Sequence, residues 1–186
     1  MTDYPALTLE TPAEHPFAPF VRILGKGKRG ARDLTREEAR EAMGMVLDDK
    51  VEDTQLGAFL MLLRHKEESA EEMAGFTEAL RERLQPPSLA VDLDWPTYAG
   101  KKRHLPWYLL AAKCLAQNGV RIFMHGAGAH TAGRLYSEQL LGALQIPLCR
   151  NWQQVGEALD NAGLAFMPLV DWAPQLQRMI DLRNTL

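Results

Sequence analysis

Apolar residues in the first half of the chain recur at the spacing of amphipathic α-helices. Behind the capping box Thr35-x-x-Glu38, the positions at i, i+3, i+4, i+7 and i+8 are apolar, and a second box, Ser69-x-x-Glu72, opens a similar pattern. We therefore predict helices that begin near residues 35, 53 and 69, preceded by another at about 17–24. Pro86-Pro87 ends this helical part, because proline lacks an amide donor and clashes with the preceding turn.

After residue 87 the pattern changes to short apolar runs separated by helical stretches. We predict strands at 89–93, 120–124, 146–149 and 164–167, and helices at 106–117, 131–144, 151–162 and 174–186. Strands that alternate with helices form a parallel sheet with right-handed crossovers. The expected fold is a mixed α+β and α/β chain. A helical bundle domain at 1–86, with 1–15 extended or disordered, precedes the first part of an α/β domain at 87–172.

Composition and charge narrow the possible partners. The chain has 186 residues and a net charge of −3, so binding to a polyanion would depend on local basic patches. No apolar run reaches the roughly 18 residues of a membrane span, and the N-terminal sequence lacks a signal-peptide pattern. We expect a cytoplasmic protein without a membrane partner.

Two basic runs are candidates for phosphate binding. The first contains Lys26, Lys28, Arg29 and Arg32 among glycines. The second, Lys101-Lys102-Arg103-His104, follows Gly100 and precedes a helix that opens near Pro106. A strand that leads into a helix N-terminus favours anions, and the neighbouring Trp107 and Tyr108 offer flat faces on which bases could stack. Each run could instead be a solvated loop, and the two aromatic residues could pack beneath the second one.

Further candidate ligand-binding residues lie at the carboxyl ends of the predicted strands, where parallel sheets bind their ligands. We call this edge of the sheet the mouth. These candidates are residues 97–104 and the pair His125-Gly126. His125 could act as an acid, a base or a hydrogen-bond donor, or it could be structural, because no acidic partner is evident. Arg183 lies on the apolar stripe of the last helix, where it either extends to solvent or meets an anion. No spacing of histidines, cysteines and acids indicates a metal site.

Several segments resemble, in order, the anthranilate phosphoribosyltransferase superfamily, also called glycosyltransferase family 3. Gln55-Leu-Gly-Ala-Phe-Leu and Leu63-Arg-His-Lys-Glu-Glu-Ser resemble motifs of its N-terminal helical domain, and Asn118-Gly-Val-Arg-Ile-Phe-Met-His-Gly resembles a later strand. The resemblance spans residues 20–186, about half of the family's usual length. It implies that residues 173–186 form a helix that returns to the helical domain, and that the protein is a homodimer through that domain.

Departures from the family pattern bear on activity. Family enzymes hold phosphoribosyl pyrophosphate with G-T-G-G-D and N-I-S-T segments, which here align with Pro96-Thr-Tyr-Ala-Gly and Pro106-Trp-Tyr-Leu. Side chains in place of the loop glycines would crowd the pyrophosphate, and the acid, asparagine and serine of these segments are missing. The acidic pair that holds magnesium in the family falls in the half that is not covered.

A few residues match family positions. The resemblance implies a ligand pocket formed by Thr97, Gly100, His125, Gly126 and Arg183. Thr97, His125 and Arg183 are the remnants of the catalytic site, and Arg183 matches an arginine that contacts the aromatic acceptor. We assign no residue a firm catalytic role.

One subgroup of the superfamily is more similar. Arg22-Ile-Leu-Gly-Lys-Gly-Lys-Arg-Gly-Ala-Arg-Asp-Leu resembles the opening of YbiB-type paralogues, which are described as homodimers that lack the substrate loop and bind nucleic acid with little sequence preference. The resemblance implies a non-catalytic binder of single-stranded DNA or RNA that needs no cofactor. The alternatives are a transferase of altered specificity that acts on an anthranilate-like or base-like acceptor with Mg²⁺, and a helical dimerisation module without a ligand.

Overall fold

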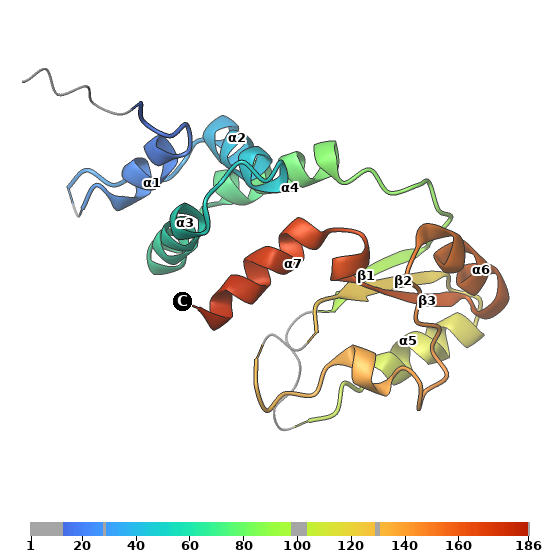
Figure 1. The fold of residues 1–186 in the computed structure, drawn as a ribbon. Helices are drawn as coiled ribbons and strands as arrows, with labels where there is room; N and C mark the ends of the chain where they lie inside the picture. Colours follow the sequence, from blue (N-terminus) through green and yellow to red (C-terminus); the bar gives the residue numbers. More distant parts are fainter. Residues whose placement is uncertain (1–12, 28, 98–103, 129–130, 186) are drawn as a thin grey trace, which may run out of the picture.

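The N-terminal part of the protein is helical. The computed structural model describes residues 13–27, 29–97, 104–128 and 131–185, apart from the side chain of Arg183. Four helices come first: α1 (Ala18–Gly25), α2 (Arg36–Leu47), α3 (Asp53–Lys66) and α4 (Ala70–Arg83) (Figure 1). These are the helices that the apolar spacing predicts. Both predicted capping boxes are present, with Thr35 and Ser69 as the N-cap residues of α2 and α4.

The helical part has its own core. The rings of Phe17 and Phe59 meet edge to face with centroids 5.2 Å apart, and Phe59 meets Phe76 in the same way at 6.2 Å. Helix α2 approaches α4 so closely that a Cβ on Gly75 would lie 2.3 Å from the carbonyl oxygen of Arg36. A glycine is therefore required where these two helices cross.

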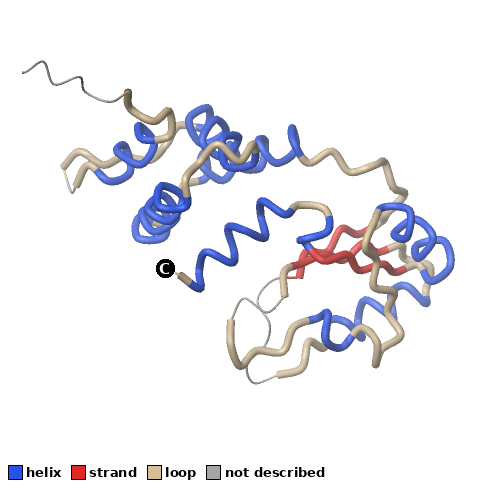
Figure 2. Tube along the Cα trace, viewed as in Figure 1, coloured by secondary structure: helices blue, strands red, loops and turns tan. Residues whose placement is uncertain are grey.

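The second part is built on a three-stranded parallel sheet. Its order is β1 (Leu93–Thr97), β2 (Ile122–Gly126) and β3 (Leu164–Pro168), and Leu93, Ile122 and Leu164 lie in register. Helix α5 (Tyr108–Gln117) covers one face, where Ile122 and Met124 are buried, and α6 (Trp152–Ala162) covers the other face above Phe123 (Figure 2). The predicted parallel sheet with crossover helices is confirmed.

Three predicted elements differ in the structure. The first strand occupies 93–97 instead of 89–93, because it is an edge strand in which half-buried Leu93 and Trp95 alternate with exposed Asp94 and Pro96. A continuous apolar run was the wrong criterion for such a strand. The segment 146–149 is not a strand, and Leu148 alone forms a bridge to Phe166.

The helix predicted at 131–144 is also wrong. Among the described residues of this stretch only η1 (Ser137–Leu140) is helical, and it is a single 3₁₀ turn. Gly133 has a φ of +71°, and this left-handed conformation is incompatible with a continuous right-handed helix through that position.

The chain returns to the helical part after β3. A short turn, η2 (Leu169–Asp171), leads into α7 (Pro174–Asp181) and η3 (Leu182–Asn184). Figure 1 shows α7 between the four N-terminal helices and the sheet. Leu176 and Met179 pack on the N-terminal core. No helix in the described part of the chain is long and apolar enough to cross a membrane.

Candidate functional site

The first basic run forms a glycine-containing turn after α1. Gly27 has a φ of +82°, and its carbonyl oxygen accepts hydrogen bonds from the amides of Gly30 and Ala31. The side chains of Lys26 and Arg29 are exposed, and neither has an ion pair or hydrogen bond to another described residue. Lys28 lies outside the described residues. The turn thus presents at least two free cations to solvent.

Arg32 does not belong to this free set. Its guanidinium donates two hydrogen bonds of 2.7 Å to the carboxylate of Glu38. This bidentate pair, together with the Thr35 cap, lowers the pKa of Glu38 to about 2. Arg32 is therefore paired with a carboxylate of the protein itself, and its contact with phosphate stays a prediction.

Contacts on both sides fix the turn against α3. A Cβ on Gly25 would lie 3.2 Å from a methyl carbon of Leu62, and Nζ of Lys66 lies 2.8 Å from the carboxylate of Asp33. Glu72, which is fully buried, accepts hydrogen bonds from Nζ of Lys66 and from the amide of Leu34. The turn therefore runs along the C-terminal part of α3, and its ends are held while its tip is exposed.

Most described arginines form ion pairs with carboxylates, whereas Lys26 and Arg29 do not. Arg36, Arg40 and Arg83 form ion pairs between α2 or its C-cap and α4, and Arg121, Arg150 and Arg178 are paired elsewhere. Within the part of the chain that the structure describes, the lysines and arginines without a hydrogen bond or ion pair are Lys26, Arg29, Arg64 and Arg81. All four belong to the helical part.

Most of the second basic run lies outside the described residues, namely Lys101, Lys102 and Arg103, and so does Gly100 before it. His104 is exposed. Just beyond it, Trp107 is 61% exposed, whereas Tyr108 lies partly buried, with its hydroxyl 2.5 Å from Oγ of Ser137. Of the two aromatic residues, Trp107 alone is open to a ligand; Tyr108 packs against Trp95.

Thr97, His125 and Gly126 meet at the carboxyl ends of β1 and β2, as the sequence predicts. The hydroxyl of Thr97 donates to the carbonyl oxygen of His125 at 3.0 Å. A Cβ on Gly126 would lie 2.2 Å from both the carbonyl oxygen and the hydroxyl of Thr97. Thr97 and Gly126 are thus used in closing the two strands against each other. Arg183 lies in η3, and its side chain lies outside the described part.

The side chain of His125 has an acidic partner that the sequence did not reveal. Nε2 of His125 lies 3.0 Å from Oδ1 of Asp94. Asp94 pairs in register with Phe123, so it is the diagonal neighbour of His125 across the two strands. Burial lowers the pKa of His125 below its usual value, while Asp94 acts in the opposite direction. Correct placement of β1 would have identified this pair.

A cavity of about 410 Å³ opens beside the mouth. Its lining includes Gly128 after β2, Pro168 at the end of β3, and the polar side chains of Glu138, Gln139, Gln177 and Asp181. Glu138 pairs with Arg150, and Asp181 accepts a hydrogen bond from Nε2 of Gln177. Two carboxylates disfavour a pyrophosphate here. Among the described residues, no group of three or more His, Cys, Asp and Glu side chains could hold a metal ion.

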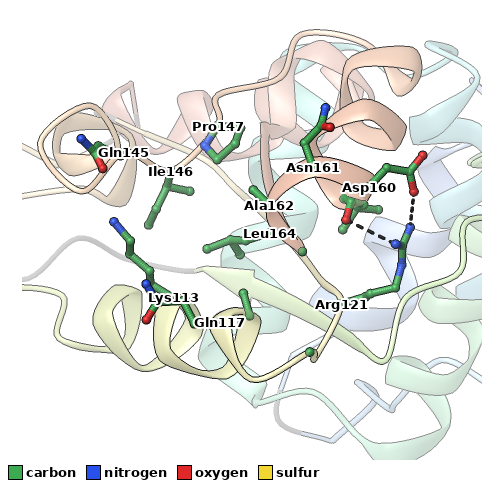
Figure 3. A pocket seen from close by; sticks show the side chains of 14 residues that line it. Lys113, Gln117, Arg121, Gln145, Ile146, Pro147, Asp160, Asn161, Ala162 and Leu164 are labelled. Atoms are coloured by element: carbon green, nitrogen blue, oxygen red, sulfur yellow. Dashed lines mark hydrogen bonds and ion pairs between the residues drawn. The ribbon is translucent and has the colours of Figure 1, made fainter.

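A further cavity, of about 620 Å³, lies at the opposite end of the sheet (Figure 3). Lys113 and Arg121 stand at its two ends, but both are occupied. Lys113 donates to the carbonyl oxygen of Leu144 at 2.6 Å, and Arg121 bonds to Asp160 and to the carbonyl oxygens of Ala90 and Leu159. These cations join loops together, so we regard this cavity as structural.

Comparison with known proteins gives consistent relatives. Residues 21–84 match the helical bundle domain of the glycosyl transferase family. The chain is 30% identical over 168 residues to the uncharacterized protein YbiB of Escherichia coli K12, covering 88% of this chain and 52% of that protein. It is 38% identical over 152 residues to the anthranilate phosphoribosyltransferase of Methylobacterium nodulans, covering 80% and 44%.

A solved structure agrees with these relatives on the fold. The crystal structure of anthranilate phosphoribosyltransferase from Thermus thermophilus superposes with a TM-score of 0.68 at 24% identity, over 92% of this chain and 50% of that one. The chain thus spans about half the length of the relatives it matches. On these grounds the chain belongs to the anthranilate phosphoribosyltransferase superfamily and contains its helical bundle domain at residues 21–84.

Proposed function

We propose that the protein is a non-catalytic member of its superfamily that binds the phosphate backbone of single-stranded nucleic acid. The observation that carries this proposal is the pairing of charges. Most described arginines are neutralised by carboxylates, while Lys26 and Arg29 project unpaired from an anchored turn. Cations that are held in place and left unpaired can neutralise phosphates and release counterions, which is the main source of affinity for nucleic acids.

Neighbouring residues support this site. The turn lies along the C-terminal part of α3, where Arg64 and His65 are exposed. The second basic run, Lys101 to His104, follows β1 in the sequence and precedes Trp107, whose side chain is exposed. Basic side chains next to flat or apolar groups are typical of single-strand binding.

The transferase alternative has weaker support. The hydroxyl of Thr97 is engaged by the backbone of His125, and the mouth carries the carboxylates of Glu138 and Asp181. Neither arrangement favours a sugar diphosphate. One observation favours magnesium-dependent phosphoribosyl transfer as a second candidate function, namely the pairing of His125 with the carboxylate of Asp94.

Alanine substitutions test the site directly. Lys26→Ala and Arg29→Ala should each weaken binding of labelled single-stranded DNA and lower the salt slope by about 0.7 per lost phosphate contact. Arg81→Ala is the matched control, because Arg81 is also exposed and unpaired but lies on α4. If Arg81→Ala weakens binding as much as the turn variants do, the binding depends on overall charge and the site assignment is wrong.

The proposed assembly is a homodimer through the helical part. Met61 of α3 and Met73 of α4 are both more than half exposed, and they are the large apolar side chains that this part leaves open to solvent among the described residues. Sedimentation velocity tests this assembly. Met61→Asp or Met73→Asp should convert a dimer into a monomer if that methionine lies in the interface, and an unchanged dimer with both variants would place the contact elsewhere.

A further inference from the structure

A third cavity, separate from the basic turn, lies on the α6 face of the sheet. It has a volume of about 380 Å³ and lies beneath the 86–91 segment that links α4 to β1. Phe123 and His125 of β2 contribute to its floor, and Trp152 of α6 and Trp172 after η2 contribute to its walls. The linker, the sheet and the final return of the chain therefore all contribute to this site.

The aromatic rings give the cavity flat walls. The rings of Phe123 and His125 are stacked with centroids 5.3 Å apart, and Trp172 meets His125 edge-on at 5.1 Å. Trp152 meets Trp172 at 5.8 Å. Four connected rings that border one cavity provide both stacking faces and ring edges, which suits a planar ligand.

The polar groups of the cavity are few and of defined character. Asp94 supplies a carboxylate with 65% of its side chain exposed, and no lysine or arginine is among the lining residues. Oδ1 of this carboxylate lies 3.0 Å from Nε2 of His125. The lining therefore disfavours an anion and offers the carboxylate of Asp94 as a hydrogen-bond acceptor.

We propose that this pocket binds a neutral, planar nitrogen heterocycle with an amino group, which is the chemistry of a nucleobase. The ring stacks among Trp152, Trp172 and His125, and the amino group donates to Asp94. A carboxylate-bearing ring such as benzoate is excluded by the charge of Asp94. The nucleobase comes either from a free nucleoside or from a bound nucleic-acid strand. Binding of a base from a strand rests on the proposed function, and binding of a free nucleoside does not.

Intrinsic fluorescence tests the pocket, since two of its walls are tryptophans. The full chain is titrated with adenosine, cytidine and guanosine, and with benzoate as an anionic ring of similar shape. Trp172→Ala removes one stacking ring, and Asp94→Ala removes the carboxylate. Trp107→Ala is the control, because Trp107 lies at the start of α5 and outside the pocket. Circular dichroism and thermal melting confirm that each variant is folded.

We expect saturable binding of an amino-bearing nucleoside, about tenfold weaker in Trp172→Ala and in Asp94→Ala, and unchanged in Trp107→Ala. Absence of nucleoside binding, or tighter binding of benzoate, overturns the proposal. Equal loss in Trp107→Ala and Trp172→Ala also overturns it. Single strands with and without abasic sites then identify the source. A preference for intact strands assigns the pocket to the strand, and equal affinities assign it to the free nucleoside, whatever the outcome at Lys26 and Arg29.

Discussion

Arg178 of α7 joins the end of the chain to the helical part through a hydrogen bond of 2.6 Å to the carboxylate of Asp53 in the first turn of α3. The same guanidinium pairs with Asp49 and donates to the carbonyl oxygen of Val51. One side chain thus holds the turn between α2 and α3, although it lies some 125 positions later in the sequence. The sheet and the helices are linked by this contact as well as by the 84–92 segment.

Loss of Arg178 should loosen this link. Arg178→Ala removes the fork of donors and leaves two carboxylates close together, so we expect a loss of about 1 kcal/mol in the free energy of unfolding and faster hydrogen exchange in α7. Arg178→Lys keeps the charge but not the fork, and it should restore only part of the loss. Urea unfolding measures the stability. An unchanged midpoint and unchanged exchange in Arg178→Ala would show that the apolar contacts of α7 suffice.

Two glycines should respond oppositely to alanine. In Gly126→Ala the new Cβ would lie 2.2 Å from the backbone oxygen of Thr97, so β1 and β2 must separate and we expect a loss of more than about 2 kcal/mol. Gly156 lies inside α6 with nothing within 4 Å of its Cβ position. Gly156→Ala should therefore stabilise the protein by about 0.5–1 kcal/mol through helix propensity. Thermal melting distinguishes the two, and a stable Gly126→Ala would disprove the tight closure of the mouth.

His125 should make stability depend on pH. Its pKa is lowered in the folded protein by burial, so below about pH 6.5 the unfolded chain takes up a proton that the folded protein does not. The contribution is fully present above pH 6.5 and is lost as the pH falls toward the folded pKa. Urea midpoints between pH 5 and pH 8 should therefore fall on acidification, and His125→Gln should flatten this fall. An equal fall in the variant would assign the effect to other groups.

Glu38 should make the free energy of unfolding depend on pH at lower pH than His125 does. It stabilises the folded protein while ionised, and this contribution is lost as the pH falls from about 4.5 toward the pKa of about 2. Glu38→Gln removes the charge-assisted bonds to Arg32 but keeps an acceptor for the amide of Thr35. We expect a loss of about 1 kcal/mol at pH 7 that shrinks at pH 3. A loss that is independent of pH would indicate a packing defect instead.

The sequence predicted the helical part well and the second part less well. Capping boxes and 3.6-residue spacing are local signals, and they identified α2 and α4 at Thr35 and Ser69. The edge strand β1 was misplaced, because its alternation of buried and exposed residues is visible only once its neighbour is known. Because β1 was misplaced, the pairing of Asp94 with His125 was not predicted. Likewise, the neutralisation of Arg32 by Glu38 depends on how the loop folds onto α2, which charge counting does not reveal.

The central claim, that free cations bind phosphate without transferase chemistry, is tested most directly by fluorescence polarisation of labelled single-stranded DNA across a salt series. Phosphoribosyl pyrophosphate with Mg²⁺ serves as the competitor. We predict that log affinity falls linearly with log salt, that affinity varies little with sequence, and that the competitor has no effect beyond its ionic strength. Absence of binding at low salt, or stoichiometric displacement of the DNA by the sugar diphosphate only when Mg²⁺ is present, would contradict the account.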